Sequence, residues 1–138
     1  MTVDSVQSQD EDDVVWRKNQ RGLPKRLPNL WIGVSVTSDA DNMRPCGTKI
    51  DALVERWKGP KFVSFEPLHG PAVEADVSDM DWIIIGAETG NRKGRIEPKE
   101  EWIADLVEIA RKADVPIWMK ANLSPYWRDE LIQEGPIR

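Results

Sequence analysis

Four short apolar runs recur along the chain, and turn-forming residues bound each of them. The runs cover residues 31–36 (WIGVSV), 62–65 (FVSF), 82–85 (WIII) and 116–119 (PIWM). Continuous apolar runs of this length are typical of strands buried on both faces, as in parallel sheets. The pattern therefore predicts four parallel strands.

Helical patterns lie between these runs. The first predicted helix carries an apolar stripe formed by Ile50, Leu53, Val54 and Trp57. Thr48 and Asp51 are placed as a capping box at its start, and Gly59 as a stop after its end. A second predicted helix begins near Pro98, and its stripe consists of Trp102, Leu106, Ile109, Ala110 and Ala113.

The last predicted helix starts at Ser124 and Pro125, ends at Gly135 and uses the apolar residues Trp127, Leu131 and Ile132. Between residues 65 and 82, two prolines and the lack of an apolar stripe predict a loop with at most one helical turn. The alternation of strands and helices predicts an α/β fold built from right-handed parallel βαβ units.

The chain divides into two parts by composition. Residues 1–26 contain an acidic block followed by basic residues, with little apolar sequence, and are predicted to be a charged leader. Residues 27–138 carry all four apolar runs and are predicted to form the βα domain. The 138 residues fit one domain, whereas a complete (β/α)8 barrel needs about 200 or more.

Composition narrows the function classes. Nineteen basic and twenty-four acidic residues give a formal charge of −5, so nucleic-acid or membrane binding is not indicated. No apolar run could span a bilayer, and the acidic start is unlike a signal peptide, so we expect a cytoplasmic protein. One cysteine, Cys46, and one histidine, His69, exclude an intrachain disulfide and a Cys/His zinc site.

Polar residues appear where each apolar run ends. In a parallel α/β array, ligands bind at the carboxyl ends of the strands, so these residues are the candidates for a binding site. The candidate ligand-binding residues of this strand-end rim are Ser35, Glu66, Glu88, Lys120 and Asn122. Two interpretations stay open, because carboxylates beside a lysine either form a structural ion-pair rim or bind a ligand and transfer protons.

Three further features carry less specific signals. Arg92, Lys93 and Arg95 form a basic loop, which is either a solvated turn or a grip for a phosphate or carboxylate. His69 lacks a sequence partner of the kind that a catalytic triad needs, and is expected to be a loop residue. The seven tryptophans are expected to pack in the core and between helices and sheet rather than to stack on bases.

Four motifs stand in a fixed order: LPNLWIGVSV, KFVSFEPLHGP, MDWIIIGAETG and VPIWMKANL. Together they resemble the C-terminal half of a phage-associated, iron–sulfur, radical-SAM-like family named after gene products thirty-seven and sixty-eight. The similarity covers about residues 27–125. The resemblance implies a partial TIM barrel, that is, a half-barrel of about four parallel βα units.

The resemblance also implies cofactors for full-length relatives. Their N-terminal half would carry a CxxxCxxC-type motif holding a [4Fe-4S] cluster, which binds S-adenosylmethionine. The family's recurring polar residues correspond to Ser35, Glu66, Glu88 and Lys120. This chain lacks the triple-cysteine motif, so it is expected to hold neither cofactor alone. Ala87, Ala121 and His69 also depart from the residues common in the family.

These observations lead to one main hypothesis and two alternatives. The main hypothesis is a C-terminal segment of a radical-SAM-like protein, inactive alone, that supplies ligand-facing residues at the strand ends. An open inner face and two open sheet edges would then pair with a separately encoded N-terminal half or with a second copy. The alternatives are a self-associating, non-enzymatic interaction module or gene remnant, and a small metal-free enzyme using Glu66, Glu88 and Lys120.

Overall fold

The computed structural model describes residues 29–136. The elements, in order, are β1 (Ile32–Ser35), α1 (Asp39–Asn42), β2 (Met43–Arg44), β3 (Gly47–Thr48), α2 (Lys49–Arg56), β4 (Lys61–Phe65), β5 (Trp82–Ile85), α3 (Glu100–Ala113), β6 (Ile117–Met119) and the 3-10 helix η1 (Ala121–Tyr126). The predicted leader, residues 1–26, lies outside the described residues.

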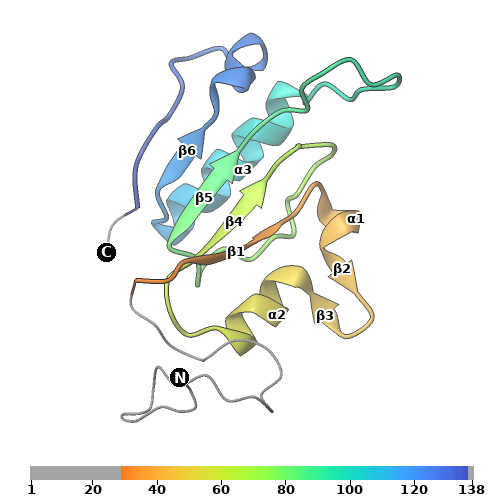
Figure 1. Cartoon of the computed structure of the whole chain (residues 1–138). Coiled ribbons are helices and arrows are strands. Elements are labelled where there is room, and N and C mark those ends of the chain that lie inside the picture. Colours follow the sequence, from red (N-terminus) through yellow and green to blue (C-terminus); the bar gives the residue numbers. More distant parts are fainter. Residues whose placement is uncertain (1–28, 137–138) are drawn as a thin grey trace.

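The four long strands form one parallel sheet. Its order is β1-β4-β5-β6, so each strand lies beside the next one along the chain (Figure 1). The predicted α/β class and the four parallel strands are therefore confirmed. The crossover between β4 and β5, residues 66–81, contains no helix, in agreement with the predicted loop.

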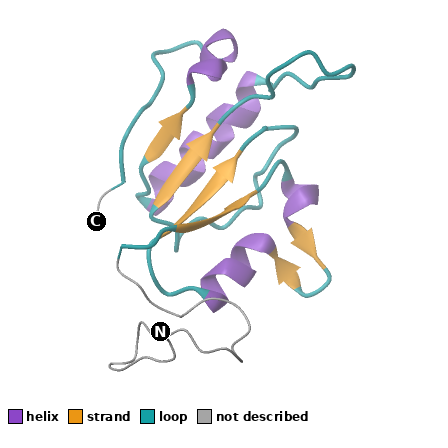
Figure 2. Cartoon of the chain, in the orientation of Figure 1, coloured by secondary structure: helices purple, strands orange, loops and turns teal. Residues whose placement is uncertain are grey.

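Helices α2 and α3 pack on the same face of this sheet. Ile50 and Leu53 of α2 and Ile103 of α3 are buried in one core cluster with Val63 of β4 and Ile83 of β5. Figure 2 shows the strands as one layer with the long helix α3 behind them. The core thus lies between the sheet and its helices, and every second strand residue points into it.

Local sequence explains both helices. The Thr48 hydroxyl accepts a hydrogen bond from the Asp51 backbone N–H at 3.0 Å, which confirms the predicted start of α2. Helix α3 has Glu100 and Glu101 in its first turn and basic residues in its last, as the helix dipole favours. It ends where Asp114 adopts a left-handed conformation with φ of 58°.

The second face of the sheet carries large side chains that are half-buried. They alternate with core residues along their strands, and they are Phe62, Trp82, Ile84 and Trp118. The rings of Trp82 and Trp118 meet edge to face with their centroids 6.4 Å apart. Among residues 29–136 the helices cover only the opposite face, so the expectation of strands covered on both faces is corrected. We call these four residues the open face.

The tryptophans are less deeply buried than expected. Trp57 is 1% exposed, and its indole N–H donates to the Pro60 carbonyl at 2.8 Å. Trp82 and Trp118 instead stand on the open face, away from the core. Core packing is therefore confirmed for Trp57 but not for every tryptophan.

The predicted third helix is wrong. Residues 121–126 form η1, which contains Pro125, and residues 132–134 then run antiparallel along β6. The Met119 N–H donates to the Ile132 carbonyl, and the Glu134 N–H donates to the Ile117 carbonyl, each at 2.7 Å. Pairing with the edge of β6 satisfies these backbone groups and outweighs the helical spacing of the apolar residues.

This C-terminal segment corrects a second expectation, namely that both edges of the sheet are open. Gln133 forms an antiparallel bridge with Trp118, and its side-chain amide donates to the Met119 carbonyl at 2.9 Å. The Ile117 N–H donates to the Glu134 carboxylate at 3.0 Å. The outward backbone groups of Ile117 and Met119 are thus all paired, and the β6 edge is closed.

Candidate functional site

The strand-end rim is built by the register of the sheet. Phe65 pairs with Ile85, and Ile85 pairs with Met119, so the residues that follow them, Glu66, Gly86 and Lys120, end up in one row. Side chains in this row point to the same side as the open face because orientation alternates along a strand. The predicted convergence of Glu66 and Lys120 is therefore observed.

Glu66 and Lys120 form an ion pair that crosses the end of β5. The Lys120 Nζ lies 2.9 Å from Glu66 Oε1, and the side chains are 45% and 27% exposed, respectively. Gly86 stands between them, and a methyl group there would come within 2.9 Å of Glu66 Cδ. The pair reaches across β5 because the middle residue is a glycine.

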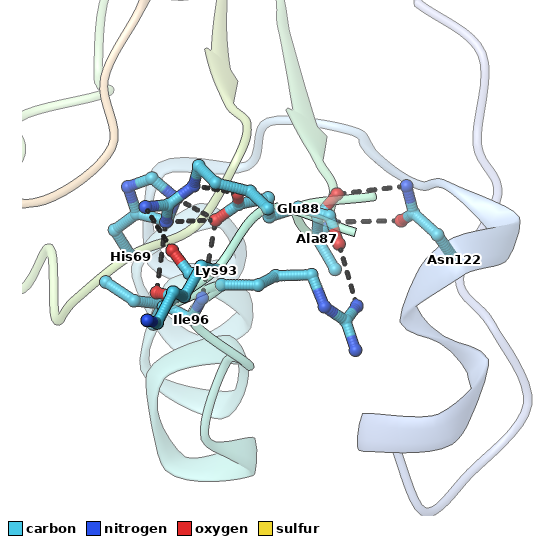
Figure 3. A network of polar contacts seen from close by, with 9 residues as sticks. His69, Ala87, Glu88, Lys93, Ile96 and Asn122 are labelled. Carbon is cyan, nitrogen blue, oxygen red and sulfur yellow. Dashed lines mark hydrogen bonds and ion pairs between the residues drawn. The ribbon is translucent and has the colours of Figure 1, made fainter. Parts of the chain in front are cut away.

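Glu88 is the centre of a second polar cluster, which Figure 3 shows. Its Oε1 lies 2.9 Å from His69 Nε2 and accepts from Arg92 Nη2 at 2.8 Å, while its Oε2 accepts from Arg92 Nε. The backbone N–H of Ile96 also donates to Oε1, at 3.3 Å. The Glu88 side chain is only 11% exposed, so this carboxylate is enclosed by its own donors.

These donors hold Glu88 in its ionised form. Hydrogen bonding to the Arg92 guanidinium lowers the pKa of Glu88 from its ordinary value of 4.5 to about 2, and the Ile96 N–H and His69 act in the same direction. Partial burial works against this change. Glu88 is therefore a fixed negative charge rather than a proton carrier near neutral pH.

The basic loop binds an internal carboxylate. Arg92 pairs with the Glu88 side chain, and Arg95 Nη1 donates to the Glu88 backbone carbonyl at 3.2 Å. Arg95 also pairs with Glu97 at 3.2 Å. From the sequence, the loop was interpreted as a solvated turn or as a binding site for an external anion. Neither interpretation predicts Glu88 as the partner of Arg92.

The structure places His69 in a loop, as expected, and gives it a partner, Glu88, that the sequence did not predict. His69 comes from the loop after β4, whereas Glu88 follows β5, and nineteen positions separate them along the chain. A sequence signal did exist, since both residues lie in the loops that follow neighbouring strands of a parallel sheet. Reasoning along the chain missed the pair because only the crossover brings the two loops together.

Asn122 acts as a structural link. Its side-chain amide accepts from the Ala87 N–H at 2.9 Å and donates to the Ala87 carbonyl at 3.1 Å. Both polar ends of the amide are used, so Asn122 ties η1 to the end of β5 (Figure 3). Its predicted place at the rim is observed, and its contacts among residues 29–136 are to the backbone.

Ser35 stands apart from the two charged clusters. Its side chain is exposed near the end of β1, where it pairs in register with Ser64 of β4. Its backbone carbonyl accepts from Lys49 Nζ at 2.9 Å, and Lys49 pairs with Asp41 at 2.8 Å. Hydrogen bonding to Lys49 is also the main cause that lowers the pKa of Asp41.

The iron–sulfur cluster implied by the resemblance does not fit the residues of this chain. Such a cluster needs several thiolates, and the chain has the single cysteine Cys46, which is exposed between β2 and β3. Within the described range no group of three or more His, Cys, Asp or Glu side chains could hold a metal ion. None of the helices in that range is both long and apolar enough to cross a membrane.

The rim therefore presents two kinds of chemistry. The Glu66–Lys120 pair is accessible and offers one positive and one negative group to a ligand. The Glu88 cluster is closed around its carboxylate but leaves the His69 imidazole 28% exposed. Neutral imidazole accepts and donates protons near neutral pH, whereas the charged pair suits binding.

Comparison with known proteins places the chain in a family. It is 30% identical over 116 residues to a dITP/XTP pyrophosphatase of Corynebacterium urealyticum, a match that covers 83% of this chain and 53% of the relative. The chain thus spans about half the length of the curated relative that it matches. No solved structure matches it. A family profile matches residues 3–134, so the chain belongs to the family described as protein of unknown function DUF5131.

Proposed function

We propose that this chain is the C-terminal half-barrel of a radical-SAM-like protein and supplies the ligand-facing rim of a site that another polypeptide half completes. The sequential strand order, with helices on one face, supports the half-barrel. The one observation that carries the binding role is the Glu66–Lys120 pair across Gly86, which lies at the carboxyl edge of the strands.

The geometry suits an amino-acid-like ligand. Lys120 can pair with a carboxylate and Glu66 with an ammonium group, because both side chains remain accessible to solvent. S-adenosylmethionine carries both groups on one carbon, and the sequence resemblance implies it for full-length relatives. The reactive cluster would come from the other half, because this chain has one cysteine.

Calorimetric titration with S-adenosylhomocysteine, a stable analogue, tests the binding role in the intact chain. Because the cluster that would bind S-adenosylmethionine tightly is absent from this chain, we expect only weak, saturable binding through the amino-acid group of the analogue. This binding should weaken about tenfold or more in Lys120→Met, because a charge-assisted hydrogen bond contributes about 1.5–3 kcal/mol. Lys112→Met is the matched control, since Lys112 pairs with Glu108 at 3.3 Å on the exposed side of α3. No binding to the wild-type chain, or equal loss in both variants, would contradict the proposal.

A second candidate function is nucleotide hydrolysis, which the name of the Corynebacterium urealyticum relative suggests. Incubation with dITP and XTP, followed by a pyrophosphate assay, separates this candidate from the first. Pyrophosphate release that Lys120→Met reduces and Lys112→Met does not would favour hydrolysis at the rim. Absence of release, together with binding of S-adenosylhomocysteine, would favour the radical-SAM-like role.

A further inference from the structure

His69 is the only histidine of the chain. It lies in the loop after one strand and forms hydrogen bonds to residues that follow two neighbouring strands. Its loop follows β4, its backbone N–H donates to the Thr37 carbonyl after β1 at 2.9 Å, and its side chain meets Glu88 after β5. The preceding residue, Leu68, is fully buried and donates its N–H to the Gly86 carbonyl at 2.9 Å. The imidazole is therefore fixed at the middle of the rim.

The contact with Glu88 determines which imidazole nitrogen carries a proton. An ionised carboxylate only accepts hydrogen bonds, so Nε2 must be the donor at 2.9 Å. In the neutral ring Nδ1 then bears a free lone pair. Within residues 29–136 the hydrogen bonds of His69 use its backbone N–H and Nε2, and none of them uses Nδ1.

Hydrogen bonds from other residues hold the Glu88 carboxylate in place and in its ionised form, so it does not take a proton from His69. Arg92 binds both of its oxygens, and the Ile96 N–H adds a further donor. The guanidinium of Arg92 therefore holds the carboxylate of Glu88, and this carboxylate holds the imidazole of His69. The His69 side chain is 28% exposed, and its Nδ1 makes no hydrogen bond within residues 29–136. A carboxylate that orients an imidazole in this way prepares it to act as a base.

We propose that His69 is a proton-accepting site of the rim, which takes a ligand that presents an O–H or N–H group to Nδ1. The ligand's proton would move to Nδ1 and its electron pair would stay on the ligand. The resulting imidazolium would be stabilised by Glu88. Glu88 and Arg92 act as positioning residues, and the site requires neither a second barrel half nor the Glu66–Lys120 pair.

The tautomer can be measured directly by ¹⁵N NMR, because a single histidine gives one unambiguous set of imidazole signals. We expect the neutral ring of the wild-type chain to be protonated at Nε2 and unprotonated at Nδ1. A neutral ring protonated at Nδ1, or an equal mixture of the two forms, would overturn the proposal without any variant being needed.

Variants test the role of Glu88. Glu88→Gln should shift the neutral ring toward a mixture of tautomers, because an amide can either accept or donate toward Nε2. Glu97→Gln is the matched control, since Glu97 lies in the same loop and contacts Arg95 instead. An unchanged tautomer in Glu88→Gln, or an equal change in Glu97→Gln, would show that Glu88 does not position the ring.

The open lone pair has its own test, with diethyl pyrocarbonate as the probe. An unprotonated imidazole nitrogen attacks this anhydride and becomes carbethoxylated, with release of ethanol and carbon dioxide. We expect His69 of the folded chain to react, and to react several-fold more slowly in Glu88→Gln than in Glu97→Gln. An unreactive His69 in the folded wild-type chain would show that Nδ1 is not open, and would overturn the proposal. Neither readout requires binding of S-adenosylhomocysteine, so failure here and failure of the proposed function can be told apart.

Discussion

Glycines shape this molecule at positions where one methyl group would collide with a neighbour. At the rim, Gly86 makes room for the Glu66 side chain on its way to Lys120. At the base of the core, Gly59 packs against the indole of Trp57, and a methyl group there would lie 2.7 Å from Trp57 Cζ2. A methyl group at Gly86 would displace a partly exposed glutamate side chain, whereas one at Gly59 would displace a buried indole. The second substitution is therefore expected to cost more stability.

We expect Gly59→Ala to destabilise the fold by about 1–3 kcal/mol, since the buried indole cannot move without losing its bond to the Pro60 carbonyl. Urea unfolding followed by tryptophan fluorescence measures this loss. Gly135→Ala is the control, because nothing lies within 4 Å of the added methyl group. Equal stability of the two variants would show that Gly59 is not sterically constrained.

The lowered pKa of Glu88 predicts a dependence of stability on pH. Because the pKa in the folded chain is about 2 and the ordinary value is 4.5, the contribution of Glu88 to stability is present above pH 4.5. It is lost as the pH falls from about 4.5 toward 2. In urea unfolding experiments the stability difference between the wild type and Glu88→Gln should therefore shrink over this range. A stability difference between the two proteins that stays constant down to pH 2 would contradict the lowered pKa of Glu88.

At the scale of elements, the C-terminal segment completes the sheet although its sequence favours a helix. Residues 132–134 occupy the outer edge of β6, and Glu134 is their main anchor. Its carboxylate forms two parallel hydrogen bonds with Arg111 of α3, at 2.8 and 2.9 Å. This pairing lowers the pKa of Glu134 and raises that of Arg111. The segment is thus fastened to both the sheet and a helix.

Removing this ion pair should loosen the edge of β6. In Arg111→Met we expect the amides of Ile117 and Met119 to exchange with solvent about fivefold faster, which corresponds to roughly 1 kcal/mol for a partly exposed bidentate pair. Hydrogen exchange followed by NMR measures this change. Lys112→Met, which removes a neighbouring charge from the same helix, should leave both amides unchanged, and an equal effect in the two variants would refute the role of Arg111.

The sequence predicted elements better than it predicted the contacts between them. The four strands of the parallel sheet and the start of α2 follow from local patterns, namely apolar runs and the Thr48 cap, whereas the short strands β2 and β3 were not predicted. The prediction of a third helix was wrong because the outward backbone groups of β6 require hydrogen-bond partners. The local spacing of apolar residues carries no information about this requirement. The Glu66–Lys120 pair followed from strand register, whereas the His69–Glu88 pair depended on how two loops meet.

At the scale of the whole molecule, the two faces of the sheet differ within residues 29–136, because one is covered by helices and the other is not. Helices cover the core face, and the C-terminal segment closes the β6 edge. The open face leaves two tryptophans, a phenylalanine and an isoleucine half-buried beside one another. Apolar surface of this kind favours association, either with a second copy or with another polypeptide.

We expect the purified chain to self-associate through the open face when no other partner is present. Light scattering should show a mass that rises with concentration in the wild type, and Ile84→Glu should abolish the rise, because a carboxylate on this face would have to be desolvated in the contact. Val73→Glu places the same charge on an exposed loop residue and should leave association unchanged. A monomer at all concentrations would argue against an interface here.

The antiparallel course of residues 132–134 has one more consequence. Because this segment runs back along β6, the described chain enters the sheet at residue 29 and leaves it at residue 136 on the same side, opposite the rim. Figure 1 shows the start of β1 and the end of the blue C-terminal segment on that side. A polypeptide that continues from residue 136 would therefore start on the side of the sheet opposite Lys120 and His69.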